Sequence, residues 1–307
     1  MPKRLLNCYA SELAGLRGRE LVESIRLSEG RVVAAEVIAP APPLLDGISN
    51  AELAAAMGAD LILLNYYDVT QPQVMGFPVA GETGGFARHT TGRGATLADV
   101  QRLTGRVVGL NLEPIENPEA ITTSGRLATG ANAGAALEQG AAYIVVTGNP
   151  ETGVTTQGIA RSLAAMRAVV GERIVIFAGK MHAAGAREAV VTADDIAAFA
   201  AAGADGLVLP TPGTVPGMTV ETGRALVQIA QSRGLLVMNT IGTSQEGASV
   251  AVIEQLALWG KLTGADIQHI GDAGYIGIAA PENITALSIT LRGRRHTWKR
   301  MAGSILR

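Results

Sequence analysis

Eight short apolar runs recur at nearly even intervals along the 307-residue chain, and this spacing constrains the fold more than any other feature. Successive runs begin 30, 46, 35, 31, 32, 30 and 32 residues apart, which is room for one strand, one helix and two short loops each time. Each run is rich in Val, Ile and Leu and precedes a turn and an Ala-rich segment of helical periodicity. The runs begin at Arg31, Leu61, Val107, Ala142, Arg173, Asp205, Leu235 and Ile267. The pattern predicts consecutive parallel βα units.

Eight evenly spaced parallel units close into a barrel more naturally than they form an open doubly wound sheet. We therefore expect an α/β fold, a (βα)₈ TIM barrel, as a single domain over residues 1–307 with the barrel itself over 31–293. A helix over residues 11–28, within an N-terminal segment 1–30, would plug the barrel floor or cover a flank, and residues 294–307 would form a C-terminal helical extension. The intervening helices are predicted at 50–58, 96–103, 132–139, 158–170, 192–202, 219–233, 249–263 and 281–292.

Composition narrows the classes of partner. Charged residues make up 17% of the chain and the formal net charge is −2, so nucleic acid and anionic membranes are not general partners. A small molecule is the expected partner, and we expect a homo-oligomer. The single cysteine, Cys8, excludes an intrachain disulfide, and the opening residues lack an apolar run of signal-peptide length. A cytoplasmic location is therefore predicted.

Polar side chains follow nearly every strand, at the end where barrel enzymes carry their active sites. The asparagines among them are the predicted ligands for substrate hydroxyls: Asn65, Asn111, Asn149 and Asn239. The predicted catalytic residues are the charged groups and the histidine at the same ends: Glu36, Glu113, Lys180, His182 and Asp272.

Lys180 carries the most weight in this prediction, because it follows the apolar segment VIFAG and burial would lower its pKa toward a nucleophilic or basic role. The alternative is an ion pair with Glu36, Glu113 or Asp272. Period-two alternation places His182 on the same side as Lys180, where it would shuttle protons, bind a metal or serve the structure alone.

The three carboxylates Glu36, Glu113 and Asp272 also form a candidate Mg²⁺ site, although no dedicated metal motif is present and no other cofactor is indicated. Two of them could instead act as the acid and base of glycoside cleavage, which requires a particular separation between them.

Glycine-rich loops follow the seventh and eighth strands and lead into helices. In many barrels this location binds a phosphate through backbone N–H groups at a helix N-terminus. The predicted phosphate-binding residues are Gly242, Thr243, Ser244, Gly271 and Gly274.

The gap of 46 residues after the second strand start leaves an extended segment with Arg88, His89 and Arg93. The segment would close over an anionic substrate, with Arg88 among its ligands, or pack on the rim or at a subunit interface.

The segments GLNLEPI, GKMHAAG, IGTSQEG and HIGDAGY, with others across the whole chain, together resemble a bacterial barrel family. Members carry the labels phosphoenolpyruvate phosphonomutase-like or haloacid dehalogenase-like hydrolase and accompany sugar phosphotransferase genes. The resemblance implies a barrel and a phosphosugar context. It transfers no reaction, and AEVIAP at the first strand lacks the nucleophile segment that the dehalogenase label requires.

The leading hypothesis is therefore an enzyme that acts on a phosphorylated sugar or sugar acid by proton transfer next to a carbonyl, as an aldolase-type lyase or an isomerase. Two alternatives stay open: Mg²⁺-assisted phosphonomutase-like lyase or hydrolase chemistry, and a non-catalytic phosphosugar-binding regulatory barrel.

Overall fold

A closed parallel barrel forms the centre of the molecule, with its strands in sequence order. The computed structural model describes residues 2–82, 90–115, 124–147, 154–180, 190–242, 244–271 and 276–307. Every strand begins within two residues of its predicted start. The strands are β1 Val32–Ile38, β2 Leu61–Asn65, β3 Val107–Leu112, β4 Tyr143–Val146, β5 Val175–Gly179, β6 Gly206–Pro210, β7 Leu236–Ile241 and β8 Ile267–Ile270. The predicted (βα)₈ barrel is confirmed.

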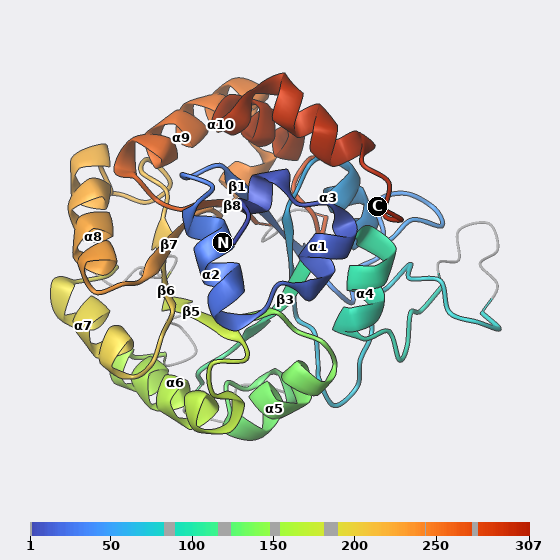
Figure 1. The fold of residues 1–307 in the computed structure, drawn as a ribbon, viewed down its shortest axis with the longest axis horizontal. Coiled ribbons are helices and arrows are strands. Elements are labelled where there is room, and N and C mark those ends of the chain that lie inside the picture. The colour runs from blue at the N-terminus through green and yellow to red at the C-terminus, as the bar shows by residue number, and fades with distance from the viewer. Residues whose placement is uncertain are drawn as a thin grey trace.

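A ring of helices surrounds the barrel, each following the strand it covers (Figure 1). Ser49, Thr96 and Thr192 start three of them as capping boxes, in which the side chain of the cap and an acidic side chain three residues later each bind a backbone N–H. The ring consists of α3 Asn50–Ala56, α4 Leu97–Thr104, α5 Gly130–Glu138, α6 Thr156–Val170, α7 Ala193–Ala201, α8 Val220–Ser232, α9 Val250–Thr263 and α10 Pro281–Ala302. None of the helices within the described ranges is both long and apolar enough to cross a membrane.

The strands divide their side chains between two buried layers, because successive residues point to opposite faces. Every second residue of each strand points into the barrel, and these residues, called here the inward parity, include Val32, Tyr143, Phe177 and Met238. The other parity packs beneath the helices. Both faces of each strand are therefore apolar, and the parity that faces inward decides which polar residues reach the mouth.

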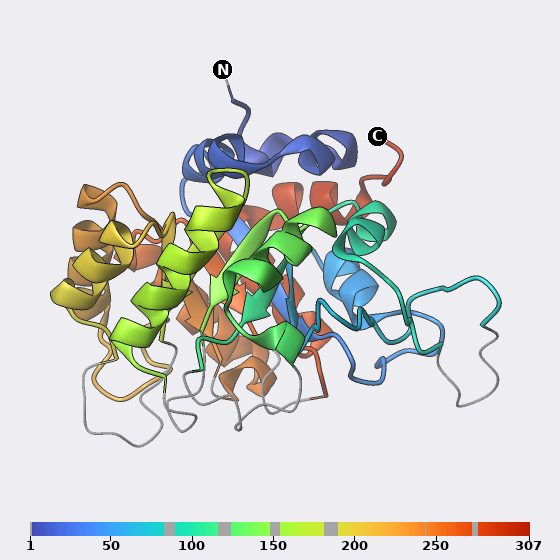
Figure 2. The ribbon, with the colours of Figure 1, turned by 90° about the horizontal axis from the view of Figure 1, so that it is seen from below.

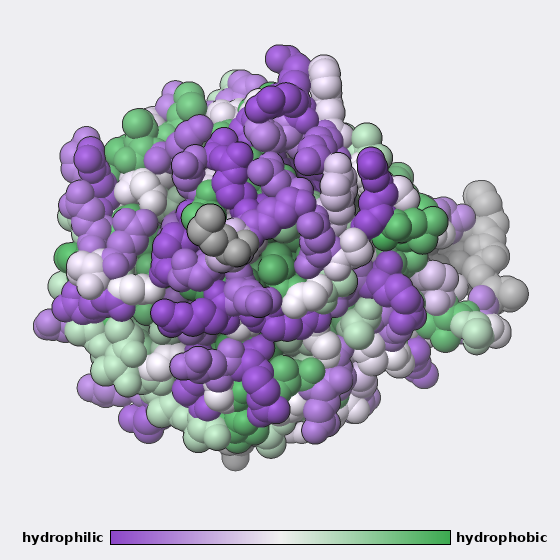
Figure 3. Space-filling view, viewed as in Figure 1, coloured by the Kyte–Doolittle hydropathy of each residue, from purple (hydrophilic) through white to green (hydrophobic). Residues whose placement is uncertain are grey.

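The N-terminal segment closes the barrel floor. It forms η1 Leu5–Asn7, α1 Ala10–Gly15 and α2 Gly18–Arg26, which lie across one end of the barrel (Figure 2). Their apolar side chains are fully buried and join the interior cluster: Leu5, Leu13, Leu21 and Ile25. The outer surface of this end is mostly hydrophilic (Figure 3). Of the two predicted arrangements, the plug is the one observed, although the single predicted helix is broken between α1 and α2.

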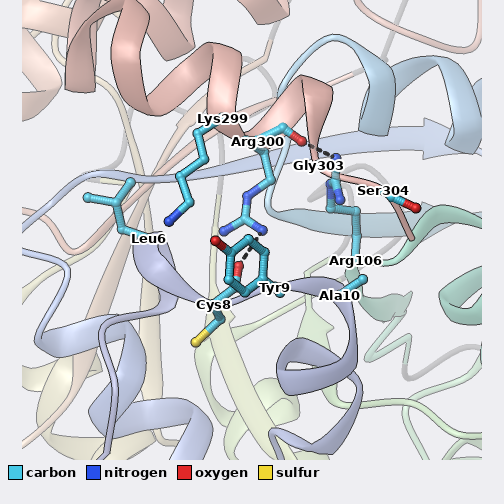
Figure 4. Close-up of a pocket in the computed structure, with 9 residues that line it drawn as sticks. All are labelled: Leu6, Cys8, Tyr9, Ala10, Arg106, Lys299, Arg300, Gly303 and Ser304. Carbon is cyan, nitrogen blue, oxygen red and sulfur yellow. Dashed lines mark hydrogen bonds between the residues drawn. The ribbon is translucent and has the colours of Figure 1, made fainter. Parts of the chain in front are cut away.

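The C-terminal half of α10 is tied to this floor by one buried carboxylate. Asp60 accepts hydrogen bonds from Arg292 Nη1 at 2.5 Å, Arg300 Nε at 2.6 Å and the Val33 N–H at 2.9 Å. Burial raises the pKa of Asp60, but the two guanidinium groups outweigh it and the net pKa is lowered. Arg300 also donates to the carbonyl of Cys8 at 3.0 Å, so the C-terminal helix holds the N-terminal segment in place (Figure 4).

Candidate active site

Glu36 and His269 meet inside the carboxyl end of the barrel. Glu36 lies on β1 and His269 on the neighbouring β8, and their exposed fractions are 4% and 1%. His269 Nε2 lies 3.0 Å from Glu36 Oε2. Neither ring nitrogen of His269 forms a hydrogen bond of good geometry within the described residues. An imidazole next to a carboxylate, with ring nitrogens available, is a pair that can take and return a proton.

A second carboxyl group, Glu246, lies in the loop after β7, near enough for the charges of Glu36 and His269 to act on it. Glu246 lies in the short 3₁₀ helix η5 Gln245–Gly247 and is fully buried. Its backbone carbonyl accepts a hydrogen bond from Asn283 Nδ2 of α10 at 2.8 Å, which holds the loop in place. Neither carboxylate oxygen has a hydrogen-bond partner among the residues described.

Burial raises the pKa of Glu246, and the negative charge of Glu36 raises it further. The backbone amides of Ser244 and Glu246 and the charge of His269 oppose this shift without cancelling it. Glu246 therefore keeps its proton to higher pH than an ordinary glutamate, which is the property of a general acid.

Gly271 provides the space that this group needs. A Cβ at this position would lie 3.3 Å from Glu36 Oε2 and 3.4 Å from His269 Cε1. Its N–H donates to the Ile241 carbonyl at 2.8 Å, so this N–H is engaged within the protein rather than available to the phosphate that the sequence predicts there. The contribution of Gly271 is the absence of a side chain.

The other described residues of the predicted phosphate site, Gly242 and Ser244, follow β7 directly. Ser244 has a φ of 76°, a left-handed conformation that costs energy for a residue other than glycine. Backbone strain of this kind concentrates at functional sites.

Two predicted asparagines lie on the inward parity of their strands. The Asn111 side chain accepts a hydrogen bond from Thr147 Oγ1 at 2.8 Å, bridging the ends of β3 and β4. Asn65 Oδ1 accepts from the Tyr66 N–H at 2.9 Å and is partly exposed. Both amides border the mouth.

Glu113 belongs to a separate cluster at the rim. It forms an ion pair with Arg126, whose guanidinium lies 4.0 Å from the centre of the Tyr66 ring. Tyr66 also has a positive φ, of 58°, and is 48% exposed. The cluster presents an aromatic ring and a cation at the edge of the mouth.

Lys180 and Asn239 lie apart from the Glu36 and His269 pair. Lys180 continues the parity of Ile176 and Ala178, which face the helices. Burial raises the pKa of Asp195 in α7, but hydrogen bonds and the nearby charge of Lys180 give a net lowering, which places the ammonium group near that helix.

The side chain of Asn239 also faces the helix layer. Its Nδ2 donates to Thr263 Oγ1 at 2.9 Å and to the Gly260 carbonyl at 3.3 Å, both in α9. The structure therefore places this predicted substrate ligand behind the barrel wall.

Several predicted site residues lie outside the described ranges: His182, Asp272, Asn149, Arg88, Thr243 and Gly274. Arg93 is described, and it pairs with Gln73 in an isolated antiparallel bridge. Of the predicted metal ligands, Glu36 contacts His269 and Glu113 contacts Arg126. Among described residues, no three His, Cys, Asp or Glu side chains are grouped as a metal site.

Sequence reasoning did not select Glu246, Arg126 or His269 as site residues. His269 was visible as a polar residue within the last strand, but its neighbour Glu36 can be identified only from the barrel closure. Glu246 lies in a loop, where no periodicity indicates the direction of a side chain. No sequence signal could have located it.

The fold and this site define a (βα)₈ barrel protein with buried carboxyl groups and a buried imidazole at the carboxyl ends of its strands. The chain belongs to the family described as a domain of unknown function, DUF7916, whose model matches residues 6–307. No curated protein matches the chain in sequence.

Solved structures share the barrel fold. A provisionally assigned fructose-1,6-bisphosphate aldolase from Coccidioides immitis has 16% identity and a TM-score of 0.50, with 94% of this chain and 99% of that chain covered. A provisionally assigned lyase/mutase from Burkholderia cenocepacia J2315 has 17% identity and a TM-score of 0.48, covering 92% and 91%. A 2,3-dimethylmalate lyase of the PEP mutase/isocitrate lyase superfamily has 16% identity and a TM-score of 0.48, covering 81% and 79%. Identities this low establish similarity of fold alone.

Proposed function

We propose that the chain is an enzyme that transfers a proton next to a carbonyl group of a small phosphorylated sugar or sugar acid, as an aldolase-type lyase or an isomerase. The observation that carries this proposal is the buried pair of Glu36 and His269 at the carboxyl end of the barrel, with the buried carboxyl of Glu246 within reach of both charges. Two buried carboxyl groups and an imidazole with so few hydrogen bonds cost stability, and acid and base catalysis accounts for their retention.

The environments of the three groups support the following roles. His269 removes the proton from the carbon next to the carbonyl, and Glu36 stabilises the imidazolium ion that forms. Glu246, with its raised pKa, donates its proton to the carbonyl oxygen, which gives an enol. Return of a proton to a different atom completes an isomerisation. In the lyase reaction His269 instead removes the proton of a hydroxyl group β to the carbonyl, the bond between the α and β carbons breaks to release an aldehyde, and its electrons form an enolate whose oxygen takes the proton of Glu246. The imidazolium ion then protonates the α-carbon, and the enol proton returns to Glu246.

An anionic substrate is supported by Arg126 at the rim. Within the described ranges its guanidinium donates one hydrogen bond, to Glu113, and its Nε has no partner, so N–H donors are left to bind a phosphate or a carboxylate. Binding of a phosphate by Gly242 and Ser244 stays a prediction, as does a Schiff base on Lys180. Metal assistance also stays a prediction, and Mg²⁺ would be held by Glu36, Glu113 and Asp272.

A thermal-shift screen tests the substrate class, because a ligand that binds the native state raises the melting temperature. The probes are inorganic phosphate, sugar phosphates, sugar acids and neutral sugars, each with Mg²⁺ or with EDTA. Stabilisation by neutral sugars alone would contradict the phosphorylated substrate. Stabilisation that depends on Mg²⁺ would favour the metal-assisted alternative.

Turnover of the stabilising compounds then tests the catalytic roles. Glu246→Gln and His269→Asn should each lower kcat by about 10²-fold to 10⁴-fold. Glu254→Gln, on the exposed face of α9, is the matched control and should leave kcat unchanged. Full turnover by Lys180→Met would exclude the Schiff base. Tight binding with no turnover in the unmodified protein would instead indicate a regulatory barrel.

A further inference from the structure

Tyr66 holds a backbone conformation that is unfavourable for its side chain. Its φ of 58° lies in the left-handed region, where the Cβ of a bulky residue crowds the following carbonyl group. Of the described residues other than glycine that have a positive φ, Tyr66 alone is aromatic. Burial of the ring does not compensate for this strain, because the residue is 48% exposed. Strain directly after β2, at the barrel mouth, indicates a role other than stability.

The ring of Tyr66 supports the guanidinium group of Arg126. The Arg126 Cζ lies 4.0 Å from the centre of the ring, which is a cation–π contact. Glu113 holds the same guanidinium group through Nη2. A planar group that is held by a ring and by a carboxylate keeps a fixed orientation, so its remaining N–H groups keep fixed directions.

These contacts do not use all the donors of Arg126. Its side chain is 15% exposed, and among the described residues it donates to Glu113 alone and leaves the buried Nε without a partner. Arg106 at the barrel floor differs, because all three of its guanidinium nitrogens donate to backbone carbonyl groups at 2.8–3.3 Å. The arginine that stabilises the floor is thus bonded at every nitrogen, whereas Arg126 keeps donors for a ligand.

Backbone contacts hold Arg126 and the loop of Tyr66 together. Arg126 ends the short 3₁₀ helix η3 Ser124–Arg126, and a Cβ on Gly125 of this helix would overlap Asp68 Oδ1 in the loop after β2. The Arg126 carbonyl accepts a hydrogen bond from the Glu113 N–H at 2.8 Å. The guanidinium group is therefore held in place by the protein itself, which lowers the entropy cost of binding a ligand there.

We propose that Tyr66 is a positioning residue that holds Arg126 as the binding group for an oxyanion, the phosphate or carboxylate group of the substrate. The inference rests on the proposed function, because it assigns the anionic end of that substrate. Since the strands close in sequence order, β3 lies opposite β7. The anion would therefore lie across the mouth from the loop that contains Gly242 and Ser244.

Isothermal titration calorimetry of the full-length protein tests this site, with inorganic phosphate and acetate as separate probes at constant ionic strength. Arg126→Gln should weaken binding by about 10-fold or more, because a hydrogen bond between charged groups is lost. Tyr66→Gly should weaken binding by about 3-fold to 10-fold, because the guanidinium group loses its support, and Tyr66→Phe, which keeps the ring, should bind within about two-fold of the unmodified protein. The probe that binds more tightly identifies the anion as phosphate or carboxylate.

Arg102→Gln is the matched control. Arg102 on α4 also pairs with a single carboxylate, that of Asp99, but its side chain is 75% exposed. Its loss should leave the affinity for both probes unchanged. Failure of the unmodified protein to bind either anion would overturn the proposal. Equal affinities of Arg126→Gln and the unmodified protein would also overturn it and would place the anion elsewhere.

The melting temperature separates this role from a purely structural one. Tyr66→Gly relieves the backbone strain, so its melting temperature should be unchanged or up to about 2 °C higher, while its anion binding weakens. If the ring served the structure alone, the melting temperature would fall and the affinity for the anion would stay the same. That result would overturn the proposal.

A second measurement covers the case in which Arg126→Gln does not fold. In unmodified protein with ¹³C-labelled tyrosine rings, the anion that binds should move the NMR signals of Tyr66, which are assigned by their absence in Tyr66→Phe. The signals of the fully buried Tyr143 should stay in place. Tyr66 signals that do not move would overturn the proposal. Since no readout uses turnover, the anion site can fail while His269 and Glu246 remain catalytic, and it can hold if no substrate is turned over.

Discussion

At the scale of the residue, the raised pKa that suits Glu246 to act as a general acid also makes the free energy of unfolding depend on pH. Its carboxyl group is fully buried, and its pKa is raised first by burial. A carboxyl group with a raised pKa in the fold favours folding below its unfolded pKa of about 4.3, and this contribution is lost as the pH rises through the folded pKa. The ionised form of Glu246 therefore opposes folding at neutral pH.

Glu246→Gln should raise the free energy of unfolding by about 1–2 kcal/mol at pH 8, because burial makes the ionised carboxyl group costlier in the fold than in the unfolded chain. Below about pH 4 the gain should vanish, because the native carboxyl group is then protonated. Urea denaturation at both pH values measures the difference. Glu254→Gln is the exposed control, and a loss of stability for Glu246→Gln at pH 8 would contradict the account.

Gly271 gives a second prediction at this scale. In Gly271→Ala the new methyl group meets Glu36 at 3.3 Å and His269 at 3.4 Å, so the pair must shift by a few tenths of an ångström. We expect turnover to fall by about 10-fold or more, since small misplacements of catalytic groups are costly, with the melting temperature nearly unchanged. Gly15→Ala, whose added methyl group meets nothing within 4 Å, should leave turnover intact.

At the scale of the element, the N-terminal segment completes the core of the barrel. Leu21 of α2 is fully buried among the interior residues, whereas Leu27, just past the end of the same helix, is 41% exposed. Leu21→Ala should lower the free energy of unfolding by about 2–4 kcal/mol through lost burial and a cavity. Leu27→Ala should cost less than about 0.5 kcal/mol. Equal losses in chemical denaturation would show that α2 is not part of the core.

The elements themselves were largely predictable, because apolar runs and capping residues repeat with a regular period. The break between α1 and α2 was not predictable. Gly18 adopts a φ of 46°, and its Cβ would lie 2.2 Å from the Glu172 carbonyl oxygen. That close approach comes from a segment far along the chain, so no local pattern shows it.

The candidate site was predictable only in part, for a related reason. Strands that are apolar on both faces do not reveal which parity lines the barrel. Glu36 and Asn111 fall on the inward parity, while Asn239 and Lys180 fall on the outward one. Which alternate residues point inward is known only from the closed barrel, in which Tyr143 and Phe177 lie in the interior.

At the scale of the whole molecule, the two ends of the barrel have different tasks. Asp60 precedes β2 at the floor, whereas Glu246 follows β7 at the mouth. Asp60→Asn should lower the free energy of unfolding by about 3–5 kcal/mol, because it leaves buried guanidinium groups without their carboxylate. Since the pKa of Asp60 is lowered, its contribution is present above the unfolded pKa and is lost as the pH falls through the folded pKa.

The effects of the two sites should add. We expect the double variant Asp60→Asn with Glu246→Gln to show the sum of the single changes within about 0.5 kcal/mol, because the sites share no partner. Denaturant titration of the four proteins measures the coupling. A larger departure from the sum would mean that a substitution at the floor changes the packing at the mouth, or the reverse.

The shared carboxylate at the floor also orders events during synthesis on the ribosome. Asp60 emerges before the arginines that neutralise it, Arg292 and Arg300, which follow it by 232 and 240 residues. Until the two arginines emerge, the start of β2 cannot be buried without leaving the Asp60 carboxylate unpaired in the interior. Pairing of Asp60 is thus delayed until all eight strands have emerged, so the nascent chain must keep its apolar strands soluble until α10 has been made.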